Sequence, residues 1–361
     1  MTRRLCSLPR QPAPSFAPGL TAARLGALLA GRRMWVNGTV LHYCFLDSRS
    51  DASVIPVPGT GELRRVPWAG GAEQREVVRG CFREWQDLGI GVTFTEVGEG
   101  HEAELRIGFQ AGAGSWSAVG RDALSAGRGE RTLNLGWDVT APGERGAVLH
   151  QIGHALGMVH EHQSPSAGLH WDDEAVYAEL AGPPNFWSRE TTYTNVLRRL
   201  DPGAADGSVW DPQSVMTLPI GPGMVLEPEQ YRGGLRPPGA PSPADKEFVL
   251  RWYPPLGPSE PAALAPFRSA PLVLGPGEQA GFTVEPPETR DYTVGTFGDT
   301  DAVLVVFEER GGEPRFLAGH DDGGTPGNAA VRVRLVRGRR YTVRVRLYST
   351  WGSGETAVMF W

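Results

Sequence analysis

The sequence is poor in cysteine, in long apolar runs and in net positive charge. It has three cysteines among its 361 residues, and their spacing suggests no pairs, so no disulfide framework is implied. No apolar stretch approaches the roughly 20 residues that a membrane-spanning helix needs. The net charge of -6 gives no general reason to expect nucleic acid or an anionic membrane as a partner. We therefore expect neither partner, and we expect a monomer.

The N-terminal region lacks a clear secretory signal. Arg3 and Arg4 are followed by prolines at 9, 12, 14 and 18 rather than by a sustained apolar block. We expect residues 1–30 to form a loosely attached tail and N-terminal extension, with a short helix over 20–30, and we expect a cytoplasmic rather than a secreted protein. Cys44 and Cys81 fall in an apparent strand and an apparent helix, where buried free thiols are expected.

The composition allows a folded chain of two domains. Hydrophobic residues make up 40% and charged residues 21%, so a buried core is feasible. A Pro/Ala-rich stretch at 256–268 predicts a linker between two regions whose sequence patterns indicate different secondary structure. We predict a first domain over 31–255 and a second over 269–361.

The first region alternates strands and helices. Apolar residues at spacings of three and four predict a helix over 72–88, and the histidine-rich stretch after residue 143 predicts a second helix. Stretches rich in β-branched and aromatic residues predict strands over 36–45, 92–97, 104–109, 114–120 and 131–137, while 46–71 is turn-rich. This order indicates an α+β domain with a mixed sheet and two long helices. A Ser-Pro-x-Asp start at 242–245 predicts a closing helix to about 253.

The second region has the pattern of a small all-β sandwich. Short alternating stretches separated by Gly, Asp and Pro turns lie at 280–284, 290–297, 302–308, 330–336, 340–347 and 356–361. Four aspartates of this region have oxygen atoms that could bind Ca²⁺, but we expect them to be ordinary turn residues: Asp299, Asp301, Asp321 and Asp322.

The residues that carry chemistry lie between 150 and 160. His150 and His154, four apart on a helix, project from one face and can take two corners of a Zn²⁺ tetrahedron. Gly157 suits a left-handed helix end, so that the chain can turn and bring His160 in as a third ligand. The spacing predicts one Zn²⁺ with a fourth position left for water.

This run resembles the zinc-peptidase motif His-Glu-x-x-His-x-x-Gly-x-x-His of the metzincins, in particular that of bacterial-type members of the astacin family. It matches at each motif position except Gln151, and Ser214-Val215-Met216 matches the methionine-containing turn, or Met-turn, that lies under the metal. The resemblance covers about 35–255 and implies a zincin-like fold with a twisted sheet, an irregular lower subdomain and a cleft between them. From about 265 the chain is similar to bacterial pre-peptidase C-terminal domains.

The resemblance also implies the way in which a ligand binds. In such enzymes an extended polypeptide adds to the edge strand of the sheet, which here involves Ser115, Trp116 and Ser117. The expected partner is thus a polypeptide in extended conformation.

Two family residues are missing from the predicted site. Gln151 stands where the family has the glutamate that takes the proton from water, and a neutral amide cannot carry that proton. Leu218 stands where astacins have a tyrosine that binds the metal or donates a hydrogen bond, and Thr217 replaces the usual histidine before it. Glu161 should point away from the site, and Glu144 lies almost two turns before His150.

Three functions therefore compete. The chain is a zinc metalloendopeptidase with weak activity, a non-catalytic pseudopeptidase that binds polypeptide in the cleft, or a repurposed zinc enzyme. We expect the C-terminal sandwich to be a binding or targeting accessory, or a stabilising appendage. The remaining histidines have no ligand spacing and are expected in exposed or loop positions: His42, His101, His162, His170 and His320.

Overall fold

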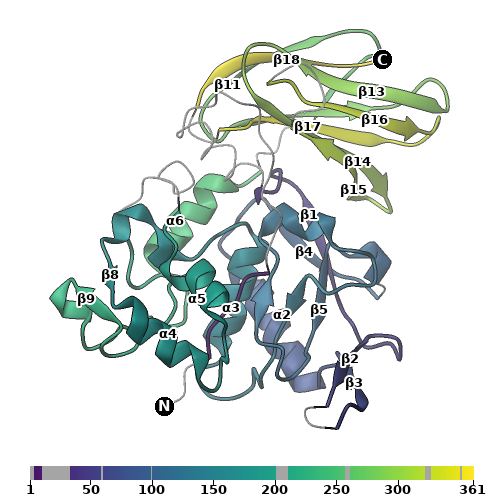
Figure 1. The fold of residues 1–361 in the computed structure, drawn as a ribbon. Coiled ribbons are helices and arrows are strands. Elements are labelled where there is room, and N and C mark those ends of the chain that lie inside the picture. Colours follow the sequence, from purple (N-terminus) through teal and green to yellow (C-terminus); the bar gives the residue numbers. More distant parts are fainter. Residues whose placement is uncertain are drawn as a thin grey trace. The chain divides into compact units, whose positions relative to one another are not determined.

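A computed structural model of the 361-residue chain describes residues 4–9, 33–57, 60–98, 100–200, 210–256, 261–321, 327–349 and 352–361. The helix expected over 20–30 lies outside them. The chain divides into two compact units (Figure 1). The first comprises Met1–Gly26, Leu41–Leu88 and Phe94–Glu247, and the second contains Phe248–Trp361 with Gly89–Thr93 and the described part of Ala27–Val40. The predicted boundaries at 255 and 269 stay a prediction.

The first unit is built on a five-stranded mixed sheet. β1 pairs in parallel with β5 and β5 with β7, while β6 runs antiparallel to β7 at the sheet edge. In spatial order the strands are β4 (Thr93–Glu96), β1 (Val40–Phe45), β5 (Leu105–Gly108), β7 (Leu133–Asn134) and β6 (Trp116–Ser117). The predicted strands and the edge position of β6 are confirmed, although β6 and β7 are shorter than expected. A β2–β3 hairpin (Ala52–Pro56 and Leu63–Pro67) occupies the stretch that we expected to be turn-rich.

Two long helices form the core of this unit with the sheet. Helix α2 (Ala72–Gln86) buries Phe82, which stacks on Tyr43 of β1 with ring centroids 4.3 Å apart. Trp85 is fully buried, and its indole N–H donates to the Leu149 carbonyl of helix α3 (Arg145–Ala155) at 3.2 Å. α2 thus fixes the position of the helix that bears the histidines.

The rest of the first unit has little sheet. It contains α4 (Asp173–Ala181), α5 (Arg189–Thr192), a π-helical turn η5 (Tyr193–Leu197), a short β8–β9 pair (His170–Trp171 and Val225–Glu227) and the start of α6 (Pro243–Trp252). Short 3-10 turns complete it: η1 (Gly100–Glu102), η2 (Gly120–Ser125), η3 (Glu161–Gln163), η4 (Pro165–Ala167) and η6 (Glu229–Tyr231). An apolar cluster that includes Leu169, Val176 and Leu218 holds it together. The predicted irregular lower subdomain and closing helix are confirmed.

Beyond the end of α6, the described residues of the second unit form β-strands and turns, in agreement with the predicted β-rich C-terminal region. One sheet has the order β10-β12-β17-β14-β15 and the other β11-β18-β13-β16, and apolar residues of both form one core that contains Tyr292, Val343 and Phe360. The strands are β10 (Ala262–Ala263), β11 (Ala270–Leu274), β12 (Gln279–Val284), β13 (Arg290–Phe297), β14 (Ala302–Arg310), β15 (Glu313–His320), β16 (Ala330–Leu335), β17 (Tyr341–Leu347) and β18 (Gly354–Phe360). β10, β11 and β15 were not expected. Because β10 pairs with β12 and Leu264 enters the core, the described part of the predicted linker belongs to this sheet.

Candidate metal centre

Helix α3 presents two histidines toward one point. Its residues from Val148 to Ala155 are all buried, and the rings of His150 and His154 lie 4.6 Å apart between centroids. After the helix ends, Gly157 adopts a φ of 101°, a conformation that glycine takes at little cost. The chain returns and places the His160 ring 5.4 Å from that of His150 and 4.9 Å from that of His154. The structure thus brings together the three histidines predicted as ligands.

Backbone carbonyls orient two of these rings. Nδ1 of His150 lies 2.8 Å from the Val215 carbonyl oxygen, and Nδ1 of His154 lies 2.8 Å from that of Met158. A carbonyl only accepts, so each Nδ1 carries the proton and each Nε2 keeps its lone pair for another partner. Within the described residues, Nε2 of His150 is buried with no hydrogen-bond partner. A cation that prefers imidazole nitrogen, such as Zn²⁺, fits this arrangement.

The Met-turn is held in place by Asp245 near the start of α6. One oxygen of the Asp245 carboxylate accepts from the Ser214 hydroxyl at 2.7 Å, and the other accepts from the Val215 N–H at 2.8 Å and the Ser242 N–H at 2.9 Å. Burial raises the pKa of Asp245, while these hydrogen bonds act to lower it. Because the Val215 carbonyl binds His150, Asp245 positions the first histidine through one intervening residue.

Met216 packs directly below α3. It is 1% exposed, and its sulfur would lie 2.5 Å from a Cβ placed on Gly153. Glycine at 153 therefore allows the Met-turn to approach the helix backbone between the two helical histidines. The expected apolar floor of the site is present.

No acidic side chain belongs to the cluster of possible ligands found among the described residues. Gln151 is 1% exposed beside it. Glu161 points away, as predicted, since its Oε1 accepts from the Asp211 N–H at 3.2 Å. Glu144 lies at the start of α3 as its N-cap. Leu218 is buried in the lower apolar cluster and has no polar atom to offer.

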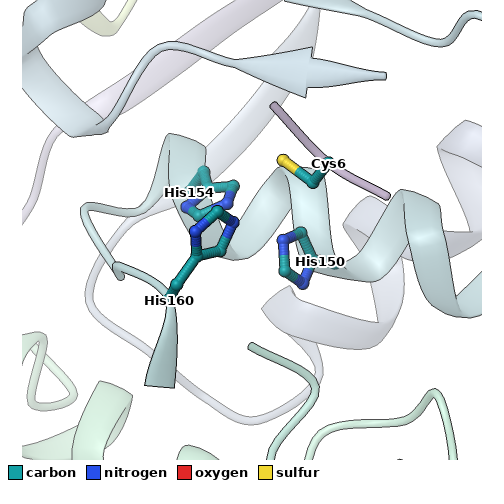
Figure 2. Close-up of side chains that lie close together, drawn as sticks. All are labelled: Cys6, His150, His154 and His160. Carbon is teal, nitrogen blue, oxygen red and sulfur yellow. The ribbon is translucent and has the colours of Figure 1, made fainter. Parts of the chain in front are cut away.

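The fourth corner of the cluster is a cysteine that we did not single out. Cys6 Sγ and one ring nitrogen each of His150, His154 and His160 all lie within 4.8 Å of one another (Figure 2). The Cys6 thiol also donates to Gln151 Oε1 at 3.6 Å. The Cys6 sulfur of the N-terminal segment lies beside the three histidines, and the fourth metal position left for water stays a prediction.

Residues 4–9 lie along the sheet edge instead of forming a loose tail. Cys6 forms a parallel bridge with Ser115, and the Ser7 N–H donates to the Ser115 carbonyl at 3.2 Å. The Leu5 N–H donates to Asn185 Oδ1 at 3.0 Å, and the Leu8 N–H donates to Asn195 Oδ1 at 2.7 Å. The expectation of a loosely attached tail is wrong for this segment, since it recovers backbone hydrogen bonds and buries Leu5 and Cys6.

The three residues predicted to bind a polypeptide have different environments. Ser115 is fully buried, and its hydroxyl accepts from the Gly136 N–H at 2.9 Å, so that only its backbone faces the N-terminal segment. Trp116 is half-buried, with the Arg131 guanidinium 5.6 Å from its ring centroid. Ser117 is buried and donates to the Ala118 carbonyl. The N-terminal segment therefore contacts this edge through the main chain of Ser115.

Burial keeps the imidazoles neutral. It lowers the pKa of His150 to about 4, and it also lowers that of His160, with the neighbouring histidines adding to the effect. Burial raises the pKa of the Cys6 thiol to about 12 when no cation is present. Neutral imidazoles are the form that binds a metal ion.

Two other histidines are buried, contrary to our expectation. His162 is 3% exposed, and its Nε2 donates to the Asn195 carbonyl at 3.1 Å. His42 lies inside β1, where its Nδ1 is 3.2 Å from Glu104 Oε2. Each gains a polar partner that depends on tertiary packing, which residue spacing does not reveal. His170 and His320 are exposed, as expected.

No sequence signal would have found Cys6 or Asp245 as parts of the site. Cys6 precedes the histidine motif by more than a hundred residues, at a spacing that does not indicate a metal ligand. Asp245 has the position of an ordinary acidic residue in the first turn of a helix. Among the described residues the histidine–cysteine cluster is the one group suited to a metal. Asp322, one of the aspartates considered for Ca²⁺, lies outside the described residues.

The comparisons with known proteins agree with this fold. The peptidase family described as Astacin matches residues 69–170. A solved structure of myroilysin is 30% identical, with a TM-score of 0.51, and the match covers 62% of this chain and 96% of that one. A second myroilysin structure is 29% identical, with a TM-score of 0.44, covering 62% and 87%. No curated protein matches.

A further match is the solved pre-peptidase C-terminal domain of a collagenase from Bacillus anthracis, at 12% identity and a TM-score of 0.25, covering 29% of this chain and 99% of that one. No helix of the described residues is long and apolar enough to cross a membrane.

The mixed sheet, the helix with two histidines, the glycine turn to a third and the Met-turn below them define a metallopeptidase scaffold of the zincin class. The chain belongs to the astacin family. The chain has an amide at 151 and a leucine at 218.

Asp245→Asn should loosen the Met-turn. The amide nitrogen cannot accept, so one of the three donors loses its partner, which should lower the free energy of unfolding by about 1–3 kcal/mol. Zinc affinity, measured by competition with a chelator, should fall about 10–100-fold because His150 loses its orientation. Asp138→Asn, in an exposed turn where Asp138 accepts from Thr140, is the matched control. Unchanged zinc affinity in Asp245→Asn would contradict this role.

Stability of the metal-free protein should fall with acid. Burial lowers the pKa of His162 to about 4, against about 6.5 in an unfolded chain. Between these values the unfolded state binds a proton that the folded state does not, so the free energy of unfolding decreases as pH falls from 6.5 to 4. In chelator, His162→Gln should reduce that slope by about 1.4 kcal/mol per pH unit, with His101→Gln as control. Equal slopes in wild type and His162→Gln would refute the burial argument.

Proposed function

We propose that this chain is a zinc-binding astacin-type scaffold that holds an extended polypeptide segment in its cleft and hydrolyses peptide bonds weakly or not at all. The observation that carries the proposal is the convergence of three buried histidines, two of them with a fixed Nδ1 proton, on one point beside Gln151. The proposal includes one Zn²⁺ per chain, held by His150, His154 and His160.

Zinc in such a site supplies Lewis acidity and lowers the pKa of water. The part that this chain would have to supply is a group that takes a proton and returns it to the leaving amine. Gln151 can donate or accept a hydrogen bond, but its amide does not carry the proton. Loss of such a group costs about 10²–10⁴ in rate. Glu161 is held by the Asp211 backbone and cannot replace it without breaking that contact.

The polypeptide-binding part of the proposal rests on the segment that occupies the cleft. Residues 4–9 use main-chain donors, and their partners are the Ser115 carbonyl and the side-chain amides of Asn185 and Asn195. Leu5 and Leu8 pack against the lower apolar cluster. The main-chain N–H groups of a polypeptide supplied from another molecule would meet the same carbonyl and side-chain acceptors, by strand addition.

The competing function is a pseudopeptidase that has lost hydrolysis entirely. Leu218 favours it, since a buried leucine removes a second polar group of the family site. We propose in addition that the C-terminal unit is an accessory domain of pre-peptidase C-terminal type that binds or targets, and that the protein acts as a monomer.

His154→Ala should abolish stoichiometric zinc. The wild type should bind one Zn²⁺ per chain by elemental analysis after gel filtration, and the variant should bind less than about a tenth of that, because two imidazoles hold zinc far more weakly than three. His170→Ala, at an exposed position, is the control and should bind as the wild type does. Absence of zinc from the wild type would overturn the proposal.

A carboxylate at 151 should raise the rate of hydrolysis in a protein that lacks the Cys6 thiol. On an unfolded protein substrate, the wild type and Cys6→Ser should cleave weakly or not at all, and Cys6→Ser/Gln151→Glu should cleave about 10²–10⁴-fold faster than Cys6→Ser. The rate of peptide-bond cleavage, with fluorescent labelling of new N-termini, is the measurement. Robust and equal cleavage by Cys6→Ser and the double variant would show that Gln151 does not limit the chemistry.

A further inference from the structure

We propose that the sandwich of the second unit carries a binding site for the chain's own residues 34–39, formed by Gln279 of β12 and by Arg344 and Arg346 of β17. Through this site the C-terminal part of the chain stays bound even when the peptide bonds between residues 256 and 261 are cut. Neither zinc nor hydrolysis is needed for this task, which comes in addition to the accessory role proposed above.

The segment that the site binds is buried along its whole length. Every residue from Met34 to Thr39 is buried, and Met34, Trp35 and Val36 are apolar. All of them belong to the second unit, together with β12 and β17. The segment continues directly into β1, which begins at Val40. The chain thus passes through the second unit before it enters the sheet of the first.

Two side chains of the sandwich donate to one carbonyl of this segment. The Asn37 carbonyl oxygen accepts from Gln279 Nε2 at 2.7 Å and from the Arg344 guanidinium at 2.9 Å. Arg346 is 6% exposed, and its guanidinium reaches the Met34 carbonyl oxygen at 3.5 Å. Since a carbonyl oxygen has two lone pairs, the two donors to Asn37 satisfy it completely. The sandwich therefore binds the main chain of the segment.

The Arg344 guanidinium meets this carbonyl without a neighbouring carboxylate. Among the described residues its hydrogen bond goes to Asn37, and burial lowers the pKa of Arg344. A cation that leaves water needs polar partners, and a hydrogen bond from a charged donor is stronger than one from a neutral donor. The bond to Asn37 thus offsets part of the lost hydration of Arg344.

The close approach of segment and sandwich requires glycine at 38. Gly38 has a φ of 82°, and a Cβ built on it would clash with the Arg344 guanidinium. The Gly38 N–H donates to the Gly91 carbonyl at 2.5 Å, and a Cβ built on Gly91 would clash with the Asn37 side chain. The backbone of the segment is therefore enclosed on two sides, and glycine leaves the space for both contacts.

The same segment is attached to the residues that follow α6. Asn37 Nδ2 donates to the Pro254 carbonyl at 2.6 Å, and the Trp35 N–H donates to the Tyr253 hydroxyl at 3.2 Å. Tyr253 is fully buried. Residues 34–39 thus join the end of α6 to the sandwich by contacts that do not use the peptide bonds between 256 and 261.

Cutting the folded, full-length protein between residues 256 and 261 tests the site. A protease recognition sequence in place of residues 257–260 allows the cut, and gel filtration shows whether the two fragments elute together. We expect the fragments of the wild type to co-elute. Arg344→Met should raise their dissociation constant, measured by dilution, at least about tenfold, because a hydrogen bond from a charged donor is lost. Arg332→Met, at an exposed position of β16, is the control and should leave it unchanged.

Gly38→Ala tests the same contact from the other side. Its Cβ meets the Arg344 guanidinium, so the dissociation constant of the fragments should rise at least about tenfold. Gly61→Ala is the matched control, because Gly61 has a φ of 71° and no atom within 4 Å of a built Cβ. Circular dichroism before the cut reports whether each variant is folded.

Separation of the fragments in the cut wild type would overturn the binding site. Equal dissociation constants for the wild type, Arg344→Met and Gly38→Ala would show that Arg344 does not hold the segment. Equal weakening by Gly38→Ala and Gly61→Ala would assign the effect to backbone strain and would likewise contradict the contact with Arg344.

Discussion

The site depends on buried imidazole rings whose orientation is set by the backbone carbonyls that they contact. In a low-dielectric interior the rings stay neutral, and each Nδ1 that meets a carbonyl must carry the proton, so each Nε2 is left with its lone pair toward the common point. For His150 that carbonyl belongs to Val215, and Asp245 holds Val215 in turn. The position of the first ligand is thus set by the start of α6, nearly a hundred residues away in the chain.

The same constraint explains why the N-terminal segment matters. Burying nitrogen lone pairs without a partner costs free energy. In this protein the Cys6 sulfur lies beside these nitrogens. The segment that carries the sulfur is held by main-chain hydrogen bonds and by two leucines rather than by the thiol alone. Pairing with the sheet edge and contact with the three histidines are therefore made by one segment, and a polypeptide from another molecule would have to displace both.

The sequence predicted those features that depend on local periodicity. His150 and His154 at one helix face, the turn at Gly157, the helix over 72–88 and most strands of both units follow from spacing, and the structure has them. It did not predict Cys6 or the burial of His42 and His162, because each depends on contacts between segments far apart in the chain. Prolines after residue 8 suggested a loose tail, but hydrogen-bond donors to Asn185 and Asn195 decide the outcome for 4–9. The β2–β3 hairpin was missed because its strands are largely exposed and carry little apolar alternation.

Zinc K-edge X-ray absorption of the zinc-loaded full-length protein tests the account most directly. We expect one zinc per chain whose nearest neighbours include three imidazole nitrogens at about 2.0–2.1 Å. One of these nitrogens should disappear in His154→Ala. A wild-type protein that binds no zinc, or that binds it without imidazole nitrogen, would contradict the account.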